Sequence, residues 1–126
     1  MLKVSVDVQR WLNKDHFEQV TEAAVKSYVK AIFTGAVNRS PVYTGSYRAS
    51  WRIGVGSPDG STTTGGSPVV PLPRPTFYWP KEYKLGETVY VSNNQPYAFD
   101  IERGHSQQAP GGVLALAVAS ASLKAV

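Results

Sequence analysis

The sequence predicts an α+β fold, in which a long N-terminal helix packs on a small antiparallel β-sheet with a long extended hairpin loop and a C-terminal helix. Two patterns carry this prediction. Apolar residues recur at helical spacing from Phe17 to Gly35, and they alternate with polar residues from Tyr47 to Val55. The length of 126 residues fits a single domain, 1–126, with a small core.

The composition limits the chemistry that this domain can carry. Without cysteine the chain has no disulfide, no thiolate nucleophile and no zinc site of the Cys-rich kind. No basic lead precedes an apolar run at the N-terminus, and no stretch approaches the ~20 apolar residues of a membrane span. We therefore expect a protein that is soluble and cytosolic when made.

The net charge of +4 lies entirely in the first half of the chain. Residues 1–56 hold eight Lys/Arg and four Asp/Glu, whereas the remainder holds five of each. This excess indicates either a surface that faces nucleic acid or an acidic partner, or an ordinary solvated helix face with scattered arginines. No block of basic residues is interleaved with aromatics, as a dedicated nucleic-acid binder would show.

The first expected elements are a short strand and the long helix. Alternation of Leu2, Val4, Val6 and Val8 favours a strand over residues 1–8, with a helix from near Ser5 as the alternative. A capping-box-like start at Asp15 opens the long helix, which should end at or before Asn38 because a proline follows at position 41. Its expected buried face comprises Phe17, Val20, Ala24, Tyr28, Ala31, Ile32 and Gly35, flanked by Val25, Val29 and Phe33.

Two strands and a long connection should follow. In the strand 47–55 the alternation buries Trp51 and leaves Arg48 and Arg52 on an open face, where they are candidates for DNA or acidic-partner contact. The Gly/Pro-rich loop at about 56–77 should project from the hairpin as a flexible tip and a polyproline-like arm. Its Pro68–Pro75 run could dock in a partner's aromatic groove or form a stiff return path. A second strand around 88–92 closes an antiparallel hairpin.

The C-terminal part begins with the densest run of polar and aromatic residues, 95–112. Gly104-His105-Ser106-Gln107-Gln108 is similar to the start of a nucleophile elbow, but the final glycine is absent and the other histidine, His16, belongs to the expected helix. A hydrolase using Ser106 is therefore the least favoured function. After Pro110 the Ala-rich segment favours a terminal helix, although it also alternates.

A metal site or a phosphate loop is not expected in this region either. Asp100, Glu102 and His105 do not share one helix face, and Gly111-Gly112 lacks the spacing and lysine of a phosphate loop. We expect no catalytic, metal or cofactor site. The alternative is a rigid polar loop in which Tyr97, Phe99 and Ile101 are buried, while the polar side chains face outward to a protein partner, namely Glu102, His105, Gln107 and Gln108.

Two segments resemble a known family. Ser40-Pro-Val-Tyr-Thr-Gly-Ser-Tyr-Arg-Ala-Ser-Trp, and later Asn94-Gln-Pro-Tyr-Ala-Phe-Asp-Ile-Glu-Arg-Gly-His-Ser-Gln-Gln-Ala-Pro-Gly-Gly, are similar to the neck or tail-completion (head-tail joining) proteins of long-tailed bacteriophages. The order of the segments covers nearly the whole chain, and the second motif is the more specific. The departures are Tyr43, where aspartate is usual, and Val113, where methionine is common.

This resemblance implies a structural virion protein without enzymatic activity, made in the host cytoplasm and assembled as a sixfold or twelvefold ring at the head-tail junction. Its implied partners are copies of itself and head-connector, tail-terminator or tail-tube proteins, with genomic DNA in the channel. A DNA-contacting or channel-lining connector module using Arg48 and Arg52 is the alternative. The implied interface residues are Tyr97, Glu102, His105, Ser106, Gln107, Gln108, Pro71 and Arg74.

Overall fold

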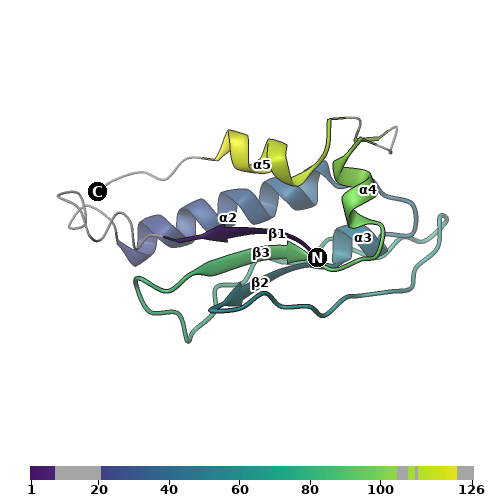
Figure 1. Ribbon diagram of the computed structural model, residues 1–126. Helices are drawn as coiled ribbons and strands as arrows, with labels where there is room; N and C mark the ends of the chain where they lie inside the picture. The colour runs from purple at the N-terminus through teal and green to yellow at the C-terminus, as the bar shows by residue number, and fades with distance from the viewer. Residues whose placement is uncertain (8–20, 105–107, 110, 122–126) are drawn as a thin grey trace.

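A computed structural model describes residues 1–7, 21–104, 108–109 and 111–121 (Figure 1). The elements are β1 (Leu2–Val6), α2 (Glu22–Arg39), α3 (Ser46–Ala49), β2 (Trp51–Val55), β3 (Val89–Asn93), α4 (Ala98–Glu102) and α5 (Leu114–Ser120). Helices and a small antiparallel sheet confirm the predicted α+β class. None of the helices in these ranges is long and apolar enough to cross a membrane.

The sheet has three strands in the order β1-β3-β2, and both pairs are antiparallel. Val91 in the central strand faces Val4 of β1 on one side and Ile53 of β2 on the other. The predicted pairing of the second and third strands is thus confirmed. The N-terminal strand is also confirmed, since Ser5 lies within β1.

Helix α2 lies across one face of the sheet, and α5 packs against α2 (Figure 1). The Thr21 side chain caps α2 by accepting a hydrogen bond from the Ala24 N–H at 3.1 Å. The predicted start at Asp15 lies outside the described residues. The helix ends at Arg39, one residue later than predicted, because Ser40 is the residue that turns extended ahead of the proline.

The buried face of α2 differs from the predicted one. Ala24 and Ile32 are buried as predicted, whereas Tyr28 and Gly35 are half-buried and the prediction for Ala31 is wrong, since it is exposed. Phe17 and Val20 lie outside the described residues. The sheet and α5 cover the helix from two sides. The centre of its buried face therefore lies at the residues that were expected at the flank. The buried residues are Ala24, Val25, Val29, Ile32, Phe33, Ala36 and Val37. They meet Trp51, Ile53, Val89 and Val91 of the sheet in one core.

The predicted strand 47–55 begins only at Trp51, because Ser46–Ala49 form the helical turn α3. Gly45 enters this turn with φ +87°, a left-handed conformation that glycine adopts without strain. The Ser50 hydroxyl closes the turn by donating to the Ser46 carbonyl at 2.7 Å. Tyr47 and Ala49 are buried as the alternation predicted, but a helical turn rather than a strand buries them.

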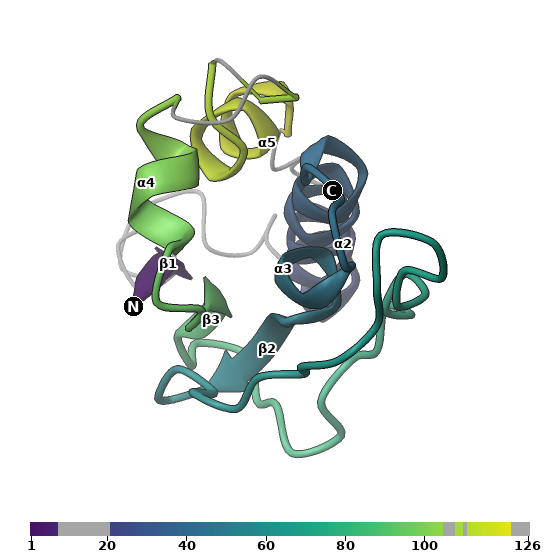
Figure 2. The same cartoon turned by 90° about the vertical axis from the view of Figure 1, so that its right-hand side faces the viewer.

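The long connection between β2 and β3 passes over the second face of the sheet at β2 and at the end of β3 (Figure 2). The Asp59 carbonyl accepts from the Ser92 hydroxyl at 3.2 Å, and the Gly60 carbonyl accepts from the Asn94 amide at 3.0 Å. A Cβ on Gly54 would lie 2.3 Å from the Ser57 carbonyl oxygen, so the chain passes directly over β2. The expectation of an open sheet face carrying arginines is therefore wrong.

The return path of this connection protects the free edge of β2. The Tyr78 hydroxyl accepts from the Ile53 N–H at 3.1 Å and donates to the Ile53 carbonyl at 3.0 Å. An unpaired strand edge invites pairing with another chain, and this side chain occupies it. Further back, the Leu72 N–H donates to the Thr44 carbonyl at 2.8 Å. Most of the segment expected to project is thus anchored to its own domain, while Val69 and Val70 at the tip stay exposed.

Candidate functional site

The two segments that carry the family resemblance meet at one end of the molecule. Asn93, at the end of β3, is fully buried and donates to the Tyr47 carbonyl at 2.8 Å. The Gln95 amide donates to the Ser50 hydroxyl at 2.9 Å. Buried polar groups of this kind require partners, and here each segment supplies them to the other. The alternation in sequence gave no reason to expect Asn93 and Gln95 in the interior.

A second connection is made by Gln108. Its side-chain amide accepts from the Val42 N–H at 2.9 Å and donates to the Val42 carbonyl at 3.1 Å, as a paired strand would. Gln108 is exposed, but its amide is bonded to its own chain. The outward placement predicted for Gln108 is confirmed, while its contact with a partner stays a prediction.

Glu102 has a structural role in the second segment. Its carboxylate accepts from the backbone N–H groups of Val113, Leu114 and Ala115 at 3.0, 2.8 and 2.8 Å. The first N–H groups of a helix have no partner within the helix, and this carboxylate supplies one for the start of α5. A Cβ on Gly112 would lie 2.7 Å from the Glu102 carbonyl, so the backbone must come this close. The prediction that Glu102 faces outward is therefore wrong.

The aromatic residues of the second segment are more exposed than predicted. Tyr97 is 40% and Phe99 45% exposed, and only Ile101 is half-buried, so the expected burial of the first two is wrong. Asp100 and Arg103 form an exposed ion pair at 3.8 Å, with Arg103 over the Phe99 ring. Of the predicted interface residues, the structure places Tyr97, Gln108, Pro71 and Arg74 at the surface.

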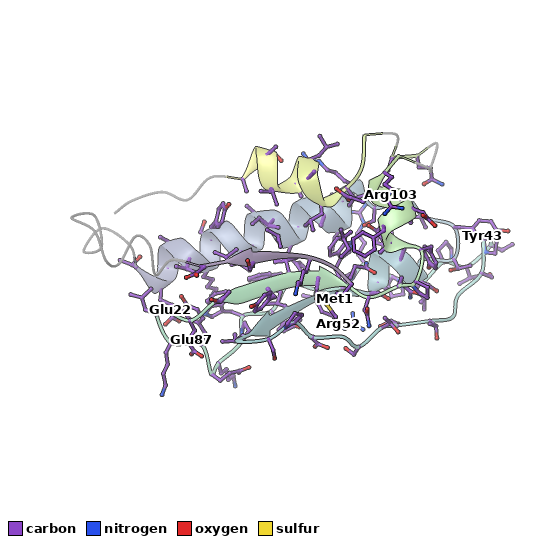
Figure 3. All side chains as sticks on the ribbon, viewed as in Figure 1. Met1, Glu22, Tyr43, Arg52, Glu87 and Arg103 are labelled. Atoms are coloured by element: carbon purple, nitrogen blue, oxygen red, sulfur yellow. The ribbon has the colours of Figure 1, made fainter. Side chains whose placement is uncertain are left out.

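A cleft of about 400 Å³ separates the two segments. Its walls come from the first segment on one side and from α4 with Gln108 on the other, and include Pro41, Val42, Tyr43, Tyr47, Tyr97 and Ile101. Tyr43 is 74% exposed at its rim, at the opposite end of the molecule from Glu22 and Glu87 (Figure 3). Among the residues that the structure describes, no charged side chain lines the cleft.

The Tyr47 hydroxyl is the unusual group in this cleft. Tyr47 is only 4% exposed, and its hydroxyl has no hydrogen-bond partner in the described part of the chain. Burial raises the pKa of Tyr47, with a further contribution from the negative charge of Glu102. A buried hydroxyl without a partner costs about 1–3 kcal/mol, so a partner supplied from outside would recover part of this. The sequence contained no signal for it.

The two arginines that are candidates for DNA contact bind the covering loop. The Arg52 guanidinium donates to the Ser61 hydroxyl at 2.9 Å, the Thr63 hydroxyl at 2.7 Å and the Ala49 carbonyl at 2.8 Å. Arg48 donates to the Leu72 carbonyl at 2.8 Å. Both are half-buried. Their hydrogen bonds hold the connection against the sheet.

The remaining predicted site residues fall in two groups. Pro71 is exposed near the loop tip, and Arg74 donates to the Asn38 side chain at 2.8 Å. His105, Ser106 and Gln107 lie outside the described residues. His105 is one of the three residues that were considered as metal ligands, so that set is not described in full. Among the residues that are described, no three His, Asp or Glu side chains group as metal ligands.

Comparison with known proteins gives no further constraint, since no family model, no curated protein and no solved structure matches this chain.

Proposed function

We propose that this protein is a structural component of the neck or tail of a long-tailed phage, which assembles as a ring at the head-tail junction and has no enzymatic activity. The observation that carries the proposal is the contact between the two segments that resemble the phage family. They are far apart in sequence, yet Gln95 and Gln108 of the second segment, and Asn93 directly before it, donate hydrogen bonds to groups of the first segment.

The hydrogen bonding of the polar side chains in the two resembling segments supports an assembly role. The Glu102 carboxylate and the Gln108 amide are bonded to backbone groups of their own chain. At the surface, the two resembling segments expose the aromatic side chains of Tyr43, Tyr97 and Phe99. Exposed aromatic side chains beside a cleft are typical of protein interfaces rather than of acid-base catalysis. The proposed partners are copies of itself in a sixfold or twelvefold ring and the adjoining connector, terminator or tail-tube proteins.

The direct test is the content of phage particles. Mass spectrometry of purified virions should detect this chain at a ring-like copy number, and deletion of its coding sequence should leave heads and tails unjoined or tails incomplete. Its complete absence from particles that remain infectious would reject the proposal.

Replacing Arg52 distinguishes a loop-binding role from DNA contact. We expect Arg52→Lys to lower the free energy of unfolding nearly as much as Arg52→Ala, by about 1–3 kcal/mol, because lysine keeps the charge but not the planar set of donors. Urea unfolding measures this cost. Arg74→Ala is the matched control and should cost less, since Arg74 is exposed.

The opposite pattern would favour the channel-lining alternative. In that pattern, the double variant Arg48→Lys/Arg52→Lys would preserve both stability and DNA retention. The double alanine variant would keep stability but lose DNA. The two charges, rather than their hydrogen bonds, would then matter.

A further inference from the structure

The tip of the long loop carries two adjacent, strongly exposed apolar side chains, one of which is the most exposed large apolar side chain among the described residues. Val69 is 89% and Val70 71% exposed. They are held outward by a closed turn, in which the Ser67 N–H donates to the Val70 carbonyl and the Val70 N–H donates to the Ser67 hydroxyl, both at 3.0 Å. Two adjacent valines fixed in water are an unfavourable arrangement for an isolated domain, and they indicate a surface that is covered on assembly.

The cleft between the two resembling segments has the complementary properties. Its rings, Tyr43, Tyr47 and Tyr97, suit contact with proline and aliphatic side chains. Its buried Tyr47 hydroxyl lacks a partner among the described residues and can donate to a carbonyl. The turn is flanked by Pro68 and Pro71, which have no N–H and present carbonyls as acceptors.

The tip does not fill the cleft of its own chain. The Gly65 carbonyl accepts from the Ser46 hydroxyl at 3.0 Å and the Leu72 N–H donates to the Thr44 carbonyl at 2.8 Å, so both ends of the tip are fixed beside the cleft. No residue of the tip lines the cleft, and both valines remain exposed. A second copy of the chain can therefore supply the tip that enters it.

We propose that the turn Ser67–Pro71 of one subunit docks in the Tyr43/Tyr47/Tyr97 cleft of a second copy, with the Tyr47 hydroxyl donating to a backbone carbonyl of the incoming turn. The turn carries no charged side chain, and neither do the described residues that line the cleft, so contact between these residues desolvates no charge. The contact joins two unlike surfaces, and such heterologous contacts close into a ring when the rotation between subunits allows it. The inference rests on the proposed ring assembly and names the contact that would build it.

Disulfide cross-linking tests this contact directly, because the natural chain has no cysteine. One chain carries Val69→Cys and a second, distinguished by a mass label, carries Tyr43→Cys. Mild oxidation of the mixed proteins at assembling concentration should give the Val69-Tyr43 heterodimer in at least tenfold excess over either homodimer. Leu85→Cys, at an exposed apolar position (44%, against 74% for Tyr43) two residues from Glu87 at the other end of the molecule, replaces Tyr43→Cys in the control (Figure 3).

A heterodimer yield no higher than in the Leu85 control would overturn the proposal, as would cross-linking of Val69→Cys to a different virion protein in particles. This failure is separable from that of the proposed function, since the virion content of the wild-type chain is measured independently. If the chain is found in particles but the cross-link does not form, the proposed function stands and the proposed contact is rejected.

Tyr47→Phe provides a second readout, in which monomer and assembly respond oppositely. Removal of an unpaired buried hydroxyl should raise the thermal midpoint of the monomer, whereas loss of the intersubunit hydrogen bond should weaken self-association by up to about tenfold, as measured by sedimentation. Unchanged association would show that the hydroxyl makes no bond to the second copy. Tyr83→Phe is the matched control: Tyr83 is buried outside the cleft, so association should not change.

Discussion

Trp51→Ala should lower the free energy of unfolding by about 3–5 kcal/mol, the usual cost of removing a large buried aromatic side chain. Trp51 is 1% exposed at the start of β2 and packs edge-on against Tyr47, with ring centroids 5.8 Å apart. Its indole N–H donates to the Ser40 hydroxyl at 2.8 Å. The substitution therefore creates a cavity and also separates the sheet from the end of α2.

Urea unfolding followed by circular dichroism measures this loss. Tyr43→Ala is the matched control, an aromatic residue that is 74% exposed, and should change stability by no more than about 0.5 kcal/mol. Trp51→Phe should cost less than Trp51→Ala because much of the volume remains. A loss near zero for Trp51→Ala in the isolated protein would contradict the packing described here.

Glu102→Ala should destabilise the protein by about 2–3 kcal/mol, because three N–H groups at the start of α5 lose a charged acceptor together. Glu102→Gln should be nearly as damaging: one amide oxygen remains, and the amide NH₂ would face a backbone N–H. Hydrogen exchange should then show lost protection at Val113, Leu114 and Ala115 before any change in the sheet.

Arg103→Ala is the control for this position. It removes the exposed ion pair with Asp100, and exposed pairs contribute about 0–1 kcal/mol. If Glu102→Ala left the exchange of α5 unchanged but abolished ring assembly, Glu102 would contact a partner directly. That result would restore the interface role that the sequence predicted.

Local sequence patterns identified most of the regular elements. The helical period carried through α2, the strand alternation placed β1, β2 and β3, and the proline ahead of the Ala-rich segment placed α5. These patterns depend on neighbours three or four residues apart, or two apart, so they can be read without the fold. The exception is α3. It is a single helical turn, and over so few residues its sequence alternates between apolar and polar as a strand does.

The site was predicted in position but not in role. The second segment was recognised as unusual from its density of polar and aromatic residues, and Glu102 and Gln108 do hold special positions in it. Their partners, the start of α5 and the Val42 backbone, are brought to them by chain folding. A polar side chain at a fixed position looks the same in sequence whether it faces a partner or its own backbone.

By itself the sequence determined the α+β class, the antiparallel pairing of β2 with β3 and the absence of cysteine chemistry. The tertiary structure alone decided which faces remain open. The loop after β2 returns across the sheet and engages Arg48 and Arg52, and the covering of α2 by α5 moves its buried face toward Val25 and Val29. Burial depends on what covers a face, and in this protein the covering segments are distant in sequence.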